Sequence, residues 1–167
     1  GLAKIDSKFD SFKINEFYNY KKDLFNIFGS IDLTNSKIQM SKLNFIKKNG
    51  VKSLLQFDFN FNSNNEYNLK KIKFLSGESL INFENLKLNN KFEIRNFKLL
   101  EIKTFDNDLK NNDFKIKKSE NIIVSGDIFD AESLLKSLYS NDEGNLFSKK
   151  FKSSIKINFV KVLTGTN

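Results

Sequence analysis

The chain has 167 residues, a formal net charge of +8, 19 Phe and no Cys, His, Pro or Trp. Because Cys and His are absent, thiol nucleophiles, Cys or His zinc sites and imidazole general bases are excluded, and we expect neither an enzyme nor a bound metal or cofactor. The basic charge suits an anionic partner, but the Lys residues are spread between apolar positions and Arg95 is the only Arg, which favours a solvated outer face.

The first third of the chain predicts extended structure. Residues 1–22 mix apolar spacings of two, three and four, which favours strands over a regular helix only weakly. Apolar residues then alternate from Leu24 to Leu33, and Thr34-Asn35-Ser36 is typical of a turn. The alternation resumes at Ile38, Met40, Leu43 and Phe45. We interpret these three pieces as a hairpin of two paired strands.

The clearest strand signal lies in Val51 to Asn62. It follows a turn at Asn49-Gly50, where Gly50 readily adopts the positive φ that tight turns require. Alternate residues of the stretch are apolar and most of the others are polar, so one face is expected to be buried and the other solvated. The apolar set comprises Leu55, Phe57, Phe59 and Phe61.

Strand-like runs continue through most of the remaining chain. We expect a bulge at Lys70-Lys71, a break at Gly77, a polar loop at Asp106 to Asn112, and a strand from Phe114 that pairs with Ile122 to Ile128. About nine to eleven strands are predicted, at the spacing of all-β proteins. The predicted fold is mainly β, a curved antiparallel sheet that forms an open, U-shaped groove, with one short helix near residues 130–140.

That helix belongs to the stretch Asn121 to Leu138, which we interpret as a strand that runs directly into a helix. Gly126 interrupts the strand and predicts a bulge or the close approach of another backbone. Asp130 is the expected N-cap of the helix, and Leu134 and Leu135 belong to its apolar stripe. These residues have expected structural roles.

Three segments occur in an order that is typical of one protein family. The first is Gly29-Ser30-Ile31-Asp32-Leu33, and the second is Leu43-Asn44-Phe45-Ile46-Lys47-Lys48-Asn49-Gly50, followed by an alternating strand and Gly77. The last is Val124-Ser125-Gly126-Asp127-Ile128-Phe129-Asp130-Ala131-Glu132-Ser133-Leu134-Leu135. Their order resembles the AsmA-like family of bacterial envelope proteins, in particular its large YhdP-like members, over roughly residues 28–138.

This resemblance implies a repeating β-groove with an apolar inner face. The groove would be anchored in the inner membrane by a segment outside this sequence and would extend through the periplasm. Phospholipid acyl chains would move along it to the outer membrane, a non-enzymatic role in lipid transport and outer-membrane biogenesis. Residues 1–167 would then be a single β-rich segment of a larger repeat protein, and residues 153–167 would begin the next repeat.

Acyl chains require a path that excludes water, since each buried methylene contributes about 0.8 kcal/mol. Alternating Phe, Leu and Ile on a sheet provide such a path, although for each residue an ordinary core position is the alternative. The candidate lipid-contacting residues are Leu55, Phe57, Phe59, Phe61, Phe92 and Ile94.

Three other functions stay open. A structural or adhesive β-protein of the cell surface would have the same strands around a closed core. A nucleic-acid-binding module would combine Lys with exposed aromatic rings, but here the aromatic residues share a face with Leu and Ile, so no nucleic acid is expected. Asp127 and Asp130 lie close in sequence, yet a strand position and a helix cap explain them without acid-base catalysis.

Overall fold

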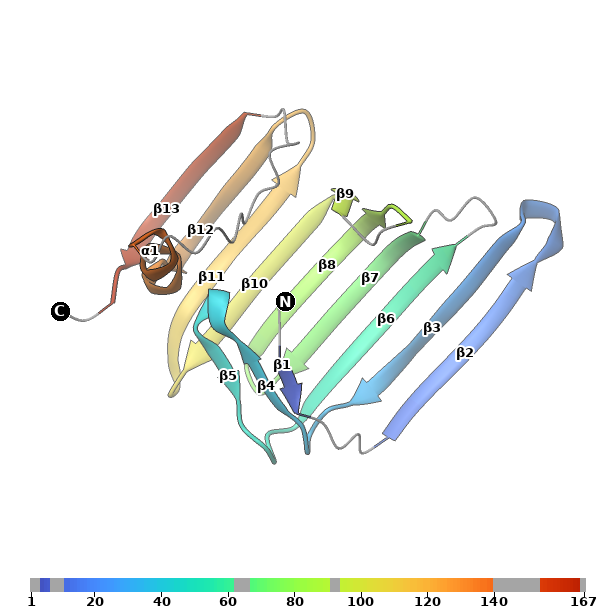
Figure 1. Cartoon of the computed structure of the whole chain (residues 1–167), viewed down its shortest axis with the longest axis horizontal. Helices are drawn as coiled ribbons and strands as arrows, with labels where there is room; N and C mark the ends of the chain where they lie inside the picture. Colours follow the sequence, from blue (N-terminus) through green and yellow to red (C-terminus); the bar gives the residue numbers. More distant parts are fainter. Residues whose placement is uncertain (1–3, 7–10, 62–66, 91–93, 140–153, 166–167) are drawn as a thin grey trace.

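The computed structural model describes residues 4–6, 11–61, 67–90, 94–139 and 154–165 (Figure 1). These residues form thirteen β-strands, one α-helix and two short 3-10 helices. The mainly β fold, the open sheet and the single short α-helix are confirmed. The strands outnumber the prediction because three of them are only three residues long.

Ten strands form the main sheet, in the spatial order β13-β12-β11-β10-β8-β7-β6-β3-β2, with β9 paired to β8. The sheet is open, and β2 and β13 are its edges (Figure 1). The strands are β2 (Ser11–Asn19), β3 (Leu24–Asp32), β6 (Ser53–Phe61), β7 (Tyr67–Ser76), β8 (Ser79–Leu88), β9 (Ile94–Asn96), β10 (Leu99–Asp106), β11 (Leu109–Lys118), β12 (Ile122–Asp130) and β13 (Ile155–Leu163).

A small sheet packs against one face of the main sheet (Figure 1). It contains β1 (Lys4–Asp6), β4 (Lys37–Met40) and β5 (Phe45–Lys47), and the 3-10 helix η2 (Ser41–Leu43) joins β4 to β5. The α-helix α1 (Glu132–Tyr139) follows β12, and the 3-10 helix η1 (Tyr20–Lys22) joins β2 to β3.

Short turns connect most neighbouring strands of the main sheet, which makes these pairs antiparallel. Asn107 and Asp108, with φ of 46° and 64°, form a two-residue turn between β10 and β11. Positive φ at both positions matches the twist of a hairpin, and Asn and Asp tolerate it. The predicted polar loop at Asp106 to Asn112 is therefore wrong, because both strands continue to this turn and Thr104 opposes Asn112.

The prediction of an antiparallel sheet is wrong at one edge, because the main sheet is mixed. β13 pairs in parallel with β12, so that Val124 opposes Ile157 and Gly126 opposes Phe159. Residues 131–154 lie between these strands, and a connection of that length lets the chain return to the same end of the sheet. Apolar alternation in β13 carries no information on the direction of its neighbour.

The predicted hairpin of residues 24–33 with residues 38–45 is also wrong. β3 pairs with β2 and β6, whereas β4 pairs with β1 and β5 in the small sheet. The turn at residues 34–36 moves the chain from the main sheet to the small sheet, and the turn at Asn49 and Gly50 returns it. Gly50 has a φ of 82°, which confirms the predicted positive φ.

The predicted bulge in β7 is confirmed. Asp58 of β6 opposes Lys71, but Phe59, the next residue, opposes Leu69. Lys70 is therefore the extra residue. Its ammonium lies 3.6 Å from the Asp58 carboxylate.

The predictions for Gly126 are confirmed as well. Phe114 opposes Gly126, whereas Asp113 opposes Ile128, so Asp127 is the extra residue of a second bulge. A Cβ built on Gly126 would lie 2.5 Å from the Cα of Phe114. The neighbouring backbone leaves no room for a side chain at this position.

The core lies between the two sheets. Leu33, Ile38 and Phe45 are buried and cluster with main-sheet residues such as Phe74 and Ile102. The rings of Phe45 and Phe74 meet edge to face with their centroids 6.2 Å apart. The small sheet therefore closes part of one face of the main sheet with ordinary protein packing.

Candidate functional site

One face of the main sheet, the apolar face, carries apolar residues across most of its width. Because the strands are in register, residues of neighbouring strands lie side by side in rows that cross the sheet. The row in the middle of this face is called the apolar strip. It contains Ile14, Phe57, Ile72, Phe83, Leu100 and Ile116, with Gly29 at the β3 position.

The opposite side of the sheet, the polar face, has a different composition. The row beside the apolar strip on that face contains Lys13, Ser30, Gln56, Lys73, Asn82, Glu101 and Lys115. Lys115 pairs with Glu101 at 2.9 Å. The hydrogen bond to Glu101 holds the pKa of Lys115 above its usual value. The two faces therefore differ in this part of the sheet, and the apolar face suits packing or an apolar ligand.

The small sheet covers part of the apolar face. The row next to the apolar strip, called the covered row, contains Ile31, Leu55, Phe74, Ile81, Ile102 and Phe114. The last four of these are buried, and Leu55 packs against the same core. Phe74 contacts Phe45 of the small sheet, whereas Phe114 contacts Phe129 and Phe159 of β12 and β13. The candidate residue Leu55 thus lies at the boundary between the covered and uncovered parts of this face.

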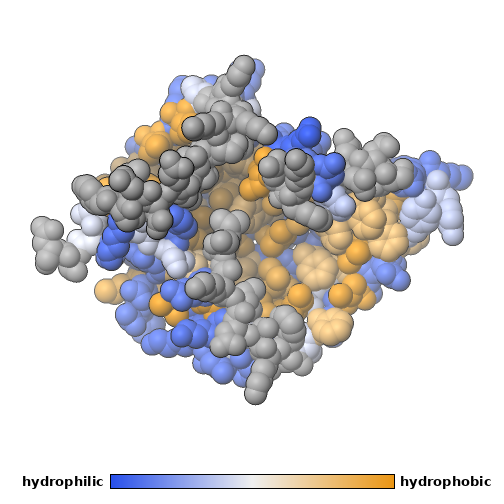
Figure 2. All heavy atoms as spheres, viewed as in Figure 1, coloured by the Kyte–Doolittle hydropathy of each residue, from blue (hydrophilic) through white to orange (hydrophobic). Residues whose placement is uncertain are grey.

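The apolar face stays accessible beside the small sheet. Figure 2 shows apolar residues gathered there over β3, β6 and β7. The candidate residues Phe57, in the strip, and Phe59, one row further, are half-buried. At the β2 edge, Phe12 and Ile14 are 66% and 53% exposed on the same face. The accessible region reaches the edge of the sheet.

A row of aromatic residues crosses the apolar face at the end of the main sheet away from the small sheet, here called the open end. This aromatic row consists of Tyr18, Phe25, Phe61 and Tyr67, with successive ring centroids 6.3, 5.0 and 6.1 Å apart. Leu88 and Ile94 continue it. The row therefore brings together two candidate residues, Phe61 and Ile94, and Ile94 is 41% exposed. The candidate Phe92 lies outside the described residues.

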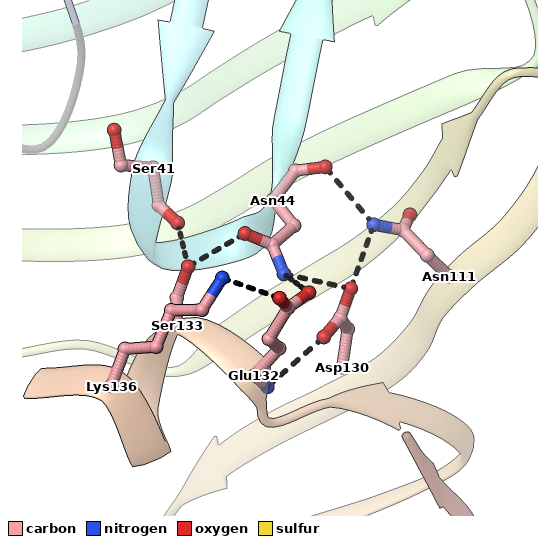
Figure 3. A network of polar contacts seen from close by, with 7 residues as sticks. All are labelled: Ser41, Asn44, Asn111, Asp130, Glu132, Ser133 and Lys136. Carbon is pink, nitrogen blue, oxygen red and sulfur yellow. Dashed lines mark hydrogen bonds and ion pairs between the residues drawn. The ribbon is translucent and has the colours of Figure 1, made fainter. Parts of the chain in front are cut away.

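A polar network holds the small sheet at the opposite end (Figure 3). Asn44 donates through Nδ2 to Oδ2 of Asp130 at 3.0 Å and to Oε2 of Glu132 at 3.2 Å. Its carbonyl oxygen accepts a hydrogen bond from Asn111 at 3.1 Å, and its Oδ1 lies 2.7 Å from the Ser133 hydroxyl. These contacts join the turn after η2 to β11 and to the start of α1, and so fix the small sheet over the covered row.

Asp130 belongs to this network and is not the N-cap residue that was predicted. The helix begins at Glu132, so Ala131 directly precedes it. The Asp130 carboxylate nevertheless accepts the backbone N–H of Glu132 at 3.1 Å, and its own N–H donates to Asn112 at 3.0 Å. Asp130 therefore stabilises the first turn from one position earlier than expected.

Two buried amides of this network lie in the region that the sequence predicts as a loop. Asn111 and Asn112 are 5% and 0% exposed. Asn112 donates to the carbonyl oxygen of Leu43 at 2.8 Å and to Thr104 at 2.9 Å. The Asn107-Asp108 pair is the sequence signal that could have predicted this strand. A two-residue turn at these positions lets β11 include both Asn111 and Asn112.

Lys47 fixes the place where the chain crosses between the sheets. This β5 side chain is 2% exposed, and its ammonium donates to the carbonyl oxygens of Ser36 at 2.5 Å, of Thr34 at 2.6 Å and of Leu33.

Asp32 precedes the same turn. Hydrogen bonds from the Thr34 side chain and then its backbone hold the pKa of Asp32 below its usual value, with smaller coulombic contributions from lysines including Lys47.

No group of three or more His, Cys, Asp and Glu residues in the described ranges is arranged to hold a metal ion. Asp127 is exposed in the β12 bulge, whereas Asp130 is buried in the network, so the two carboxylates have separate surroundings.

Comparison of the chain with protein-family models, with curated proteins and with solved structures finds no match. The resemblance to the AsmA-like family therefore stays a prediction. No helix in the described part of the chain is long and apolar enough to cross a membrane.

Proposed function

We propose that the protein binds phospholipid acyl chains on its apolar face and has a non-enzymatic role in lipid transport across the cell envelope. One observation carries this proposal. The apolar strip crosses the sheet from β2 to β11 without a charged side chain, and most of its members are only partly buried. The same strands carry Lys, Glu and amides on their other face.

The dimensions of the apolar strip suit an acyl chain. From β10 to β2 the strip crosses five strand spacings of about 4.8 Å, roughly 24 Å in all. One leaflet of a bilayer provides about 15 Å of hydrocarbon, so a chain that fills a leaflet fits within the strip. Each methylene removed from water there contributes about 0.8 kcal/mol.

The resemblance supports the cellular part of the proposal. An AsmA-like protein would be periplasmic, anchored in the inner membrane through a segment outside this sequence, and its apolar face would form part of a longer groove. The proposal includes this location and this direction of transport.

A structural or adhesive β-protein is the second candidate. The covered row favours it, because protein already closes the apolar face there. A partner domain that closed the apolar strip in the same way would leave no place for lipid. The two candidates differ in whether the purified chain carries and binds lipid.

The test is native mass spectrometry of protein purified without detergent, followed by lipid extraction. We expect bound phospholipid that is lost from the double variant Phe57→Asp and Phe59→Asp. Because these residues are half-buried, a second pair, Phe12→Asp and Ile14→Asp, removes exposed apolar side chains at the edge with less risk to folding.

The matched control is Phe17→Asp, which changes a side chain of the same strand that is 60% exposed on the polar face. It should retain the lipid. A monomer that carries no lipid and binds no added phospholipid would overturn the proposal in favour of the structural candidate. Equal loss of lipid from the edge pair and from the control would also contradict it.

A further inference from the structure

We infer that the open end of the main sheet binds the headgroup of an anionic phospholipid whose acyl chain lies on the apolar strip. This inference rests on the proposed function and deepens it by naming the class of lipid. Three cationic residues at the open end, called the basic rim, carry it: Arg95, Lys98 and Lys118.

Backbone pairing places two members of the basic rim side by side. The N–H of Lys118 donates to the carbonyl oxygen of Lys98 at 3.1 Å, which extends the β10–β11 ladder by one pair. Side chains alternate along a strand, so Lys118 of β11 lies on the same face as Ile116, and Lys98, the residue before β10, opposes Lys118 through the backbone. Both lysines therefore lie one row beyond the apolar strip.

Arg95 lies in β9 between Ile94, which opposes Leu88, and Asn96, which opposes Lys87, so it is the extra residue of a bulge. The ammonium of Lys118 lies 3.4 Å from the carbonyl oxygen of Arg95. Arg95 and Lys98 are exposed, and the preceding residue, Ile94, continues the aromatic row. A ligand here would meet positive charge and apolar surface at adjacent positions.

The charges of the basic rim favour an anion. Like charges directly opposite one another on paired strands are destabilising, and Lys98 opposes Lys118. Four ion pairs of described residues involve Lys70, Lys110, Lys115 and Lys136, and neither Arg95 nor Lys98 takes part in these four. A phosphate beside these cations would add favourable charge-assisted hydrogen bonds, and the planar guanidinium of Arg95 suits phosphate oxygens.

The aromatic row supplies an independent reason to place a headgroup at this end. Tyr prefers the boundary between hydrocarbon and headgroups, where its ring is apolar and its hydroxyl is solvated. Tyr18 and Tyr67 lie in the row, and Tyr20, beside Lys21, is 85% exposed in η1. From the strip to the open end, the face therefore changes from aliphatic to aromatic and basic, as a bilayer does from its interior to its surface.

The test compares two lipids with identical acyl chains, dioleoyl phosphatidylglycerol and dioleoyl phosphatidylcholine, in neutral detergent micelles. We expect the unaltered protein to bind the anionic lipid roughly fivefold or more tightly, since one basic side chain near an anionic lipid contributes about this factor. The triple variant Arg95→Gln, Lys98→Gln and Lys118→Gln should lose this preference and still bind phosphatidylcholine.

The control variant removes three positive charges from the polar face, through Lys13→Gln, Lys71→Gln and Lys117→Gln, which are all exposed. It should keep the preference. Equal binding of the two lipids by the unaltered protein, or an equal loss in the control, would overturn the headgroup inference and leave the proposed function intact. If neither lipid binds, both the headgroup inference and the proposed function are wrong.

Glycerol phosphate separates a lipid site from a site for soluble anions, because it has a phosphate and no acyl chain. We expect it to displace phosphatidylglycerol only at concentrations far above that of the lipid. If it competes with an affinity equal to that of the lipid, the basic rim is a site for soluble anions and the inference is wrong.

Discussion

The ammonium nitrogen of Lys47 donates a hydrogen bond to the carbonyl oxygen of Ser36 at 2.5 Å, although the side chain is almost completely buried. Two further carbonyl oxygens, of Leu33 and Thr34, accept hydrogen bonds from the same group. These oxygens replace the water that a lysine ammonium normally binds. Lys47 thus couples the small sheet to the turn through which the chain enters it.

Lys47→Met should destabilise the fold. Met has a similar length but cannot donate, so buried carbonyl oxygens lose hydrogen bonds, and we expect a loss of about 1–3 kcal/mol in the free energy of unfolding. Urea denaturation measures this loss. Lys48→Met, at the exposed neighbouring position, should change stability by less than about 0.5 kcal/mol. Equal effects of the two substitutions would show that the carbonyl contacts of Lys47 contribute nothing.

Asp130→Asn should loosen the polar network at nearly constant side-chain volume. The carboxylate accepts hydrogen bonds from Asn44 and from the backbone N–H of Glu132. In the Asn variant an NH₂ group replaces one carboxylate oxygen and would face one of these two N–H groups. We expect a loss of about 1–3 kcal/mol and faster hydrogen exchange at residues 41–47 and 132–136. Asp127→Asn in the exposed bulge is the control, and unchanged exchange in both variants would contradict the role given to Asp130.

Gly126→Ala should be costly. The new methyl group would collide with the backbone of Asp113 and Phe114 across the bulge, and the strands must separate to accommodate it. We expect a destabilisation of about 1–3 kcal/mol, measured by thermal or urea unfolding. Ser125→Ala, one residue earlier, should have a smaller effect, and a Gly126→Ala variant as stable as the parent would show that the bulge yields without cost.

Asp32→Asn should reduce the pH dependence of stability in acid. The pKa of Asp32 is lowered in the folded state, so its contribution is present above the unfolded pKa, about 3.9, and is lost as the pH falls through the folded pKa. The variant should therefore be less stable than the parent at pH 7, and this difference should shrink toward pH 3. Urea unfolding at both pH values tests this.

Asp106→Asn serves as the control for the loss of one negative charge from an exposed position. A stability difference between Asp32→Asn and the parent that stays constant from pH 7 to pH 3 would contradict the linkage to Asp32. A stability difference that grows toward low pH would contradict the linkage to Asp32 more strongly.

Local features of the fold were predictable because they depend on residues close in sequence. Alternation in Val51 to Asn62 predicted the apolar and polar faces of β6, and Lys70-Lys71 predicted the bulge in β7. Gly126 was identified as a place of close backbone approach because it interrupts a run of β-branched residues. The strand that runs into α1 followed from Asp130 and the Leu pair after it.

The pairing of strands was less predictable. The alternation on both sides of residues 34–36 suits a hairpin, yet β3 and β4 belong to different sheets. Lys47 holds the two strands in this arrangement. Its neighbours in the sequence do not distinguish it from the exposed lysines of the chain. Asn111 and Asn112 were assigned to a loop because polar residues in a row favour one, and only their contacts with the η2 region explain their burial.

The sequence by itself determined the mainly β fold, the two unlike faces of the main sheet and the short helix, since these depend on alternation and on backbone preference over a few residues. Tertiary structure alone decided the parallel direction of β13, the position of the small sheet and the meeting of Lys98 with Lys118. The physical reason is distance along the chain. Contacts such as that between Asn44 and Asp130, 86 residues apart, form only when the whole sheet is assembled.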